Sequence, residues 1–122
     1  RMGGDNITTH LVPLSTGIDM VKASIILALG DMPDIKTKIN CGAAIRYFDV
    51  PVGVIRSICG VEMARAIPGV KQITFTKSVG EESTLIHCSN DRIGFVIAQA
   101  ETAADAVKVC EAAMKAVEII IE

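Results

Sequence analysis

The most regular stretch of the sequence lies between Thr102 and Ile121, which read TAADAVKVCEAAMKAVEIII. Small and apolar side chains recur there every three or four residues, with charged side chains on the opposite side, which is typical of an amphipathic helix. Thr102 followed by Asp105 is a helix-start pattern. The β-branched run after Glu118 favours a strand. The stretch therefore predicts a helix followed by a short final strand.

Strand patterns precede this helix. Short runs rich in β-branched and aromatic residues, bounded by Gly, Pro, Asn or Asp, predict strands at 43–48, 52–59, 70–77 and 93–99, with a short helix at 61–67. From residue 52 onward the elements follow a β-α-β-β-α-β order, which is ferredoxin-like. We therefore expect an α+β fold, with a mostly antiparallel sheet and helices on one of its faces.

The first third of the chain predicts a simpler arrangement. Residues 1–14 contain glycines, Asn, Thr and Pro and predict a loop. A helix then begins with a T-x-x-D pattern at Thr16 and Asp19, and its apolar side chains recur with helical spacing. Gly30 is expected to end this helix in a left-handed conformation.

Composition narrows the classes of function. The chain has 122 residues, a net charge of −2, one Tyr and no Trp. A protein that binds nucleic acid would need a clustered basic face and stacking aromatics, so no nucleic-acid partner is expected. No apolar run approaches the length of a membrane span, and no signal-peptide pattern is present, which favours a cytoplasmic protein without a membrane partner.

The cysteines give no sign of a metal centre. The four residues lie far apart, at Cys41, Cys59, Cys88 and Cys110, and no C-x-x-C pair occurs. We expect all four to be reduced and mostly buried as small apolar side chains. No metal site is therefore predicted in this chain.

Residue types suited to anion binding gather at the N-terminus, namely Arg1, Gly3, Gly4, Asp5 and His10. Consecutive glycines allow backbone N–H groups to converge on an anion. An arginine close by can add a bidentate contact to the same carboxylate or phosphate. The segment is thus the candidate site for chemistry.

Longer strings around these residues point to a family. They read RMGGDNI from Arg1, HLVPLSTGID from His10 and RIGFVIA from Arg92. Together they resemble the C-terminal portion of ATP-grasp ligases, in the branch with biotin carboxylase-like and L-amino-acid-ligase-like enzymes, some labelled phosphoribosylglycinamide synthetase relatives. The resemblance covers essentially the whole chain and roughly the last third of such an enzyme.

The resemblance implies an ATP-dependent carboxylate–amine ligase that acts through an acyl-phosphate. Arg1 would be the catalytic residue that holds the activated carboxylate, where preorganised donors stabilise developing charge. Gly3, Gly4, Asp5 and His10 would contribute to substrate binding, with a backbone N–H from Gly4. Asp5 would line the pocket for the second substrate, and His10 would lie near its rim in a structural, hydrogen-bonding role.

The resemblance also sets the expected partners and cofactors. Residues 1–34 would be the tail end of the ATP-grasp core and residues 35–122 a C-terminal lobe, together forming one compact unit. In the family, the groups that hold ATP and Mg²⁺ precede this stretch. The isolated chain is therefore expected to fold, to bind neither tightly, and to be inactive without the upstream domains, which would complete the site for small carboxylate and amine substrates.

Two questions stay open from the sequence. Because Arg1 precedes Met2, either Arg1 is a vector remnant ahead of a true start, or the chain is a piece of a longer protein. The alternative to a ligase fragment is a free-standing, non-catalytic α+β module for ligand binding or dimerisation. Exposed strand edges would also allow a homodimer of the isolated chain.

Overall fold

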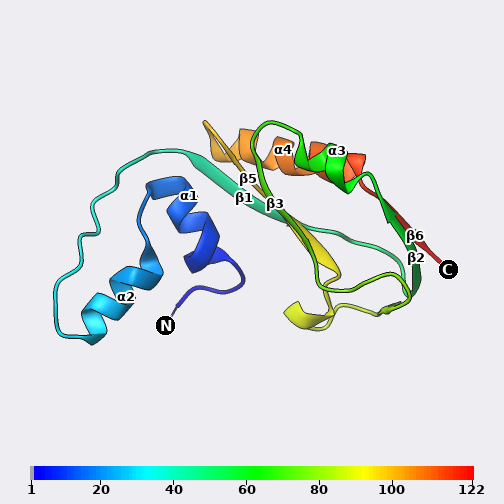
Figure 1. The fold of residues 1–122 in the computed structure, drawn as a ribbon, viewed down its shortest axis with the longest axis horizontal. Helices are drawn as coiled ribbons and strands as arrows, with labels where there is room; N and C mark the ends of the chain where they lie inside the picture. The colour runs from blue at the N-terminus through cyan, green and yellow to red at the C-terminus, as the bar shows by residue number, and fades with distance from the viewer. Residues whose placement is uncertain (1) are drawn as a thin grey trace.

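A computed structural model describes residues 2–122 (Figure 1). The elements follow in the order π-helix η1 (Ile7–Leu11), α1 (Val12–Thr16), α2 (Met20–Ala28), β1 (Gly42–Tyr47), β2 (Gly53–Cys59), α3 (Val61–Arg65), β3 (Val70–Phe75), β4 (Glu82–Ser83), 3-10 helix η2 (Ser89–Asp91), β5 (Gly94–Ala100), α4 (Ala103–Ala116) and β6 (Glu118–Ile121). The α+β class is confirmed, and so are the final helix and strand.

The strands form two antiparallel sheets, in the orders β1-β5-β3 and β4-β2-β6. The predicted β-α-β-β-α-β order is formed by β2, α3, β3, β5, α4 and β6, with the two-residue strand β4 and η2 added between β3 and β5. The strands do not form the one sheet that we expected. β1 pairs with β5 along its whole length, from Gly42 opposite Ala100 to Tyr47 opposite Phe95, and β3 occupies the other edge of β5. Because both edges of β5 are taken, β2 pairs with β4 and β6 instead.

One face of the β1-β5-β3 sheet is covered by α3 and α4, which lie together across it in Figure 1. The buried side of α4 consists of the small residues Ala106, Cys110 and Ala113, which allow close packing on the sheet. The Cys110 thiol lies 3.6 Å from the carbonyl oxygen of Val96 in β5. Cys110 is therefore a core residue, as the helical spacing predicted.

The opposite face of this sheet is approached by η1 and α1. Ile97 of β5 is completely buried, although its side chain points away from the face that α4 covers. The Gln99 side chain donates a hydrogen bond to the carbonyl oxygen of Leu14 at 2.5 Å. The sheet thus lies between helical segments from the two ends of the chain.

Two expectations for the N-terminal third are wrong. Residues 1–14 are not all loop, since η1 and most of α1 lie within them, and Pro13 stands in the first turn of α1, where proline is tolerated. Thr16 does not begin the next helix; its hydroxyl donates to the carbonyl oxygen of Val12 at 2.7 Å, in the turn that ends α1. Asp19 alone caps α2, accepting from the backbone N–H of Lys22 at 2.9 Å.

α2 and the connection that follows it extend away from both sheets in Figure 1. Gly30 takes a left-handed conformation with φ of 90° after α2, as the sequence predicted. Residues 31–41 then run to β1 without a helix or strand of their own. They are tied to α1 by a hydrogen bond from the N–H of Lys38 to the carbonyl oxygen of Thr16 at 2.8 Å.

Two further sequence expectations concern cysteines and membranes. All four thiols are free, but only Cys110 is buried, while Cys59 and Cys88 are exposed, so the expectation of mostly buried cysteines is wrong. Within residues 2–122, no single helix has the length and apolar character to cross a membrane. The segments Ile7–Thr16 and Met20–Ala28 meet that standard only when they are taken together, and they are bent by 112°.

Candidate substrate pocket

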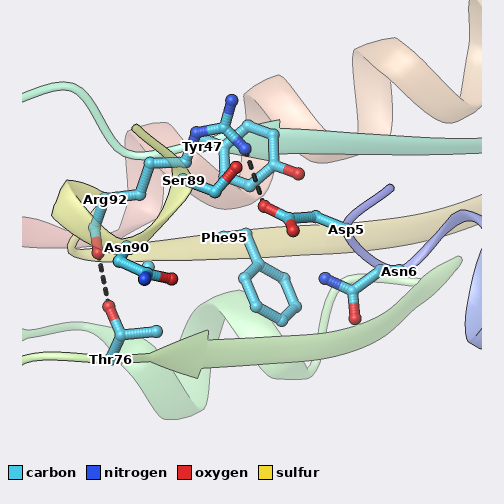
Figure 2. A pocket seen from close by; sticks show the side chains of 9 residues that line it. Asp5, Asn6, Tyr47, Thr76, Ser89, Asn90, Arg92 and Phe95 are labelled. Atoms are coloured by element: carbon cyan, nitrogen blue, oxygen red, sulfur yellow. Dashed lines mark hydrogen bonds and ion pairs between the residues drawn. The ribbon is translucent and has the colours of Figure 1, made fainter. Parts of the chain in front are cut away.

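A cavity of about 330 Å³ lies where the N-terminal segment meets one end of the β1-β5-β3 sheet (Figure 2). Its walls come from four separate parts of the chain: the turn before η1, the end of β1, the residue after β3, and the segment from η2 into β5. The lining residues are Asp5, Asn6, Tyr47, Thr76, Ser89, Asn90, Arg92, Gly94 and Phe95.

Arg92 dominates the electrostatics of this pocket. Its guanidinium carbon lies 3.8 Å from the centroid of the Tyr47 ring, and its Nη1 donates to Oδ2 of Asp5 at 2.9 Å. The side chain of Arg92 is 31% exposed and that of Asp5 is 42% exposed, so solvent reaches both. Figure 2 shows Arg92 stretched across the Tyr47 ring with Asp5 facing it. The arrangement holds one positive and one negative group at the mouth of a partly aromatic cavity.

A tight turn delivers Arg92 to this position. Oδ2 of Asp91 accepts hydrogen bonds from the backbone N–H groups of His87 and Cys88, each at 2.8 Å, which closes the turn around η2. These bonds stabilise the carboxylate and lower the pKa of Asp91 below its usual value. The carbonyl oxygen of Arg92 accepts from the Thr76 hydroxyl at 2.5 Å, which ties the turn to the end of β3.

Gly94 permits the close packing below the pocket. A Cβ atom at this position would lie 2.5 Å from the carbonyl oxygen of Thr74 and 2.9 Å from a ring carbon of Phe75. No side chain fits there without a shift of β3. The neighbouring Phe95 then packs edge-on against Tyr47, with ring centroids 6.2 Å apart. The two rings form the apolar part of the cavity wall.

The N-terminal wall is set by an unusual backbone conformation. Asn6 is left-handed, with φ of 57°, a region that Asn tolerates better than most residues. It precedes η1, and the turn places both Asp5 and Asn6 on the pocket. The N–H of Gly3 donates to the hydroxyl of the buried Thr8 at 3.0 Å, which anchors the segment ahead of the turn.

The predicted site residues do not all lie at the pocket. Asp5 lines the pocket, whereas Gly3, Gly4 and His10 do not. His10 lies in η1 and shares a hydrogen bond between its Nδ1 and the Thr9 hydroxyl at 2.8 Å. Arg1, the predicted catalytic residue, lies outside the described residues. The roles expected for these residues remain predictions.

Sequence reasoning missed the side chains that shape the pocket most. The sequence places Arg92 and Phe95 in the RIGFVIA string and Tyr47 in a predicted strand, without indicating that these side chains line a pocket. The available signal was an arginine placed directly after a Ser-Asn-Asp turn and two residues before a glycine that begins a strand. Such a position puts a long cationic side chain at the end of a sheet.

The pocket chemistry suits a small charged molecule. A guanidinium group has five N–H donors in a planar fork that matches a carboxylate or phosphate, and the bond to Asp5 involves Nη1. Asp5 offers acceptor oxygens to an ammonium group, and Asn6, Ser89 and Asn90 offer neutral polar groups. Within residues 2–122 no group of three His, Cys, Asp or Glu side chains is placed to hold a metal ion.

Comparison with known proteins identifies relatives of this fold. A family described as L-amino acid ligase C-terminal domain 2 matches residues 46–122. Phosphoribosylglycinamide synthetase from Anaerococcus prevotii matches with a TM-score of 0.81 and 23% identity, over 100% of this chain and 32% of that one. L-amino acid ligase from Bacillus licheniformis matches with a TM-score of 0.80 and 19% identity, over 100% of this chain and 31% of that one.

These matches settle the resemblance that the sequence indicated. The chain spans about a third of the length of the two solved structures. A search of curated proteins gives no match. The matched family domain covers well over half of the chain and includes every pocket residue except Asp5 and Asn6. The likeness to the C-terminal portion of ATP-grasp ligases is thereby confirmed, and the chain belongs to the L-amino acid ligase C-terminal domain 2 family.

Proposed function

We propose that this chain is the C-terminal portion of an ATP-dependent carboxylate–amine ligase that acts through an acyl-phosphate, and that its pocket forms one edge of the substrate site. The observation that carries the proposal is the Arg92–Asp5 pair. It joins the segment expected to end the catalytic core to the family domain that residues 46–122 match. A substrate bound there would contact both parts.

The pocket supports binding of a substrate that carries a carboxylate. The Arg92 guanidinium would bind the carboxylate, and the faces of Tyr47 and Phe95 would contact its apolar part. An amine on the same or the second substrate would bind Asp5. A cavity of about 330 Å³ is at the small end of ligand pockets, which fits a metabolite rather than a macromolecule.

ATP and Mg²⁺ would supply the phosphoryl group and its charge compensation in the parent enzyme. Among residues 2–122 no trio of His, Cys, Asp or Glu side chains is placed to hold a metal ion. Because the family resemblance places the groups for ATP and Mg²⁺ ahead of this stretch, we assign both to upstream domains of the same polypeptide. This chain would contribute orientation of the substrate and shielding of the acyl-phosphate from water.

Steady-state kinetics of the parent ligase test the proposal. We expect Arg92→Ala to raise the KM for one substrate by about tenfold or more, as the loss of a charge-assisted hydrogen bond implies. Arg56→Ala is the matched control, because Arg56 pairs with Glu122 on the surface and does not line the pocket. An unchanged KM for every substrate in Arg92→Ala would refute the role of the pocket.

A non-catalytic ligand-binding module remains the competing function. It would use the same pocket, where a cationic and an anionic side chain, Arg92 and Asp5, lie beside two aromatic rings. The two functions differ in a simple assay. A ligase releases phosphate from ATP only when its carboxylate and amine substrates are present, whereas a binding module in a longer protein binds the small molecule without ATP turnover. Binding without any phosphate release would favour the module.

A further inference from the structure

An apolar surface without a partner lies on α2 and the connection that follows it. Large apolar side chains along this stretch are between 40% and 89% exposed. We call them the α2 surface, which consists of Val21, Ile25, Leu27, Leu29, Met32, Ile35 and Ile39. Isolated exposed apolar residues are ordinary, whereas seven large ones within residues 21–39 indicate an interaction site.

The helix itself has the composition of a buried element. α2 reads MVKASIILA, with Lys22 and Ser24 as its polar side chains, so apolar residues occupy nearly all of its circumference. Helices of that kind are found inside large proteins or in membranes. In this chain only Ala23 of α2 is buried, and the helix packs chiefly against η1. α2 therefore has the composition of a buried helix, although only one of its residues is buried.

We propose that the α2 surface is the docking face for the preceding part of the parent polypeptide. Both solved structures that match the full length of this chain are about three times as long, and the matched family is a C-terminal domain. Met2 already touches this helix, because its sulfur accepts a hydrogen bond from the Ser24 hydroxyl at 3.3 Å. The N-terminal end of the described residues therefore lies against α2.

A membrane is the less suitable occupant of the α2 surface. At 1.5 Å per residue, a helix as short as α2 extends about 14 Å, roughly half of a bilayer core. Asp19, Asp31 and Asp34 lie along this stretch together with Lys22, Lys36 and Lys38. The stretch therefore has no excess of positive charge to attract anionic lipids, whereas a protein interface commonly has an apolar centre and a polar rim.

Substitution in two contexts tests the proposal. The double variant Ile25→Lys/Leu29→Lys is made in the 122-residue chain and in the longer protein that contains it. In the 122-residue chain both positions are exposed, so we expect no change in the midpoint of thermal unfolding. In the longer protein the same charges would be buried, and the midpoint should fall by about 3 °C or more. Met63→Lys on α3, which is 69% exposed, is the matched control and should change neither midpoint.

Hydrogen exchange gives a second readout that does not depend on activity. The amides of α2 should exchange at least about tenfold more slowly in the longer protein than in the 122-residue chain. Equal exchange and equal midpoints in the longer protein would overturn the proposal. It would also fail if the double variant released the 122-residue chain from phosphatidylcholine–phosphatidylglycerol vesicles, or if it dissociated a dimer of the longer protein. The inference rests on the family assignment, so loss of ligase activity alone would not decide it.

Discussion

Replacing Arg92 with alanine should loosen the contact between the N-terminal segment and the domain. The guanidinium joins Asp5, which lies 87 positions earlier in the chain, to the ring of Tyr47 at the end of β1. Both contacts disappear when the side chain is cut back to Cβ. Within residues 2–122, the Arg92–Asp5 pair is the one ion pair made by residues that line the pocket.

The expected loss is modest because the site is partly exposed. An ion pair whose side chains keep 31% and 42% exposure contributes about 0.2 to 1 kcal/mol after solvent screening. A guanidinium over an aromatic face at such a site adds about 0.5 to 1 kcal/mol. We therefore expect Arg92→Ala to lower the free energy of unfolding by about 0.7 to 2 kcal/mol.

Tyrosine fluorescence provides a direct assay. The chain contains one Tyr and no Trp, so its intrinsic emission comes from Tyr47 alone. Urea unfolding should be followed by circular dichroism and by this emission, for Arg92→Ala, Asp5→Asn and the double variant. The double-mutant cycle separates the ion pair from the contact with the ring, and should give a coupling of about 0.5 kcal/mol between Arg92 and Asp5.

A specific result would refute this reasoning. Native-state emission that is identical in the parent chain and in Arg92→Ala would show that the cation does not lie on the ring in solution. Zero coupling between Arg92 and Asp5 would remove the ion pair as the link between the segment and the domain. Either result would also weaken the case for a preformed substrate pocket.

Two further predictions concern α4. Thr102→Ala should lower the free energy of unfolding by about 1 kcal/mol, because the Thr102 hydroxyl caps the helix by accepting from the N–H of Asp105 at 3.1 Å. Thr102→Ser keeps a hydroxyl and should retain most of this stability. Equal losses for the two variants in urea unfolding would contradict the capping role. Burial raises the pKa of the Cys110 thiol above its ordinary value of 9.0, so the unfolded thiol ionises first and stability should fall as the pH rises above about 9. In urea unfolding, Cys110→Ala should show a smaller fall in the free energy of unfolding above pH 9 than the parent chain, whereas Cys88→Ala, at an exposed site, should show the same fall as the parent. Equal falls in the two variants would show that Cys110 does not contribute.

The elements from β1 onward were predictable because their signals are local. Apart from the short β4 and η2, which were not predicted, each strand and helix there shows its own local pattern, and the Thr102 cap lies three residues from its partner. η1 and α1 lack such signals, unlike α2. α1 is short and carries Pro13 in its first turn, and η1 follows a pair of glycines, so the composition is that of a loop although the backbone is helical.

Strand pairing and the pocket depend on contacts between distant residues. Nothing within β1 shows that it, and not β2, lies beside β5; that choice follows from the register between Gly42–Tyr47 and Phe95–Ala100. Asp5 was found because it belongs to a recognisable string. Arg92 was missed because its two partners lie elsewhere in the sequence, and an arginine beside a turn has no periodicity to reveal its role.

The division into two sheets leaves the final strand in an exposed position. β6 is an edge of the β4-β2-β6 sheet, and its residues Ile119, Ile120 and Ile121 form the kind of run that assembles into aggregates when a long edge is open. Two features limit that hazard: the strand is short, and the acidic residues Glu118, with which it begins, and Glu122, which follows it, lie on either side of the isoleucines. Lengthening β6, or neutralising these two carboxylates, would convert a protected edge into a template for intermolecular β-pairing.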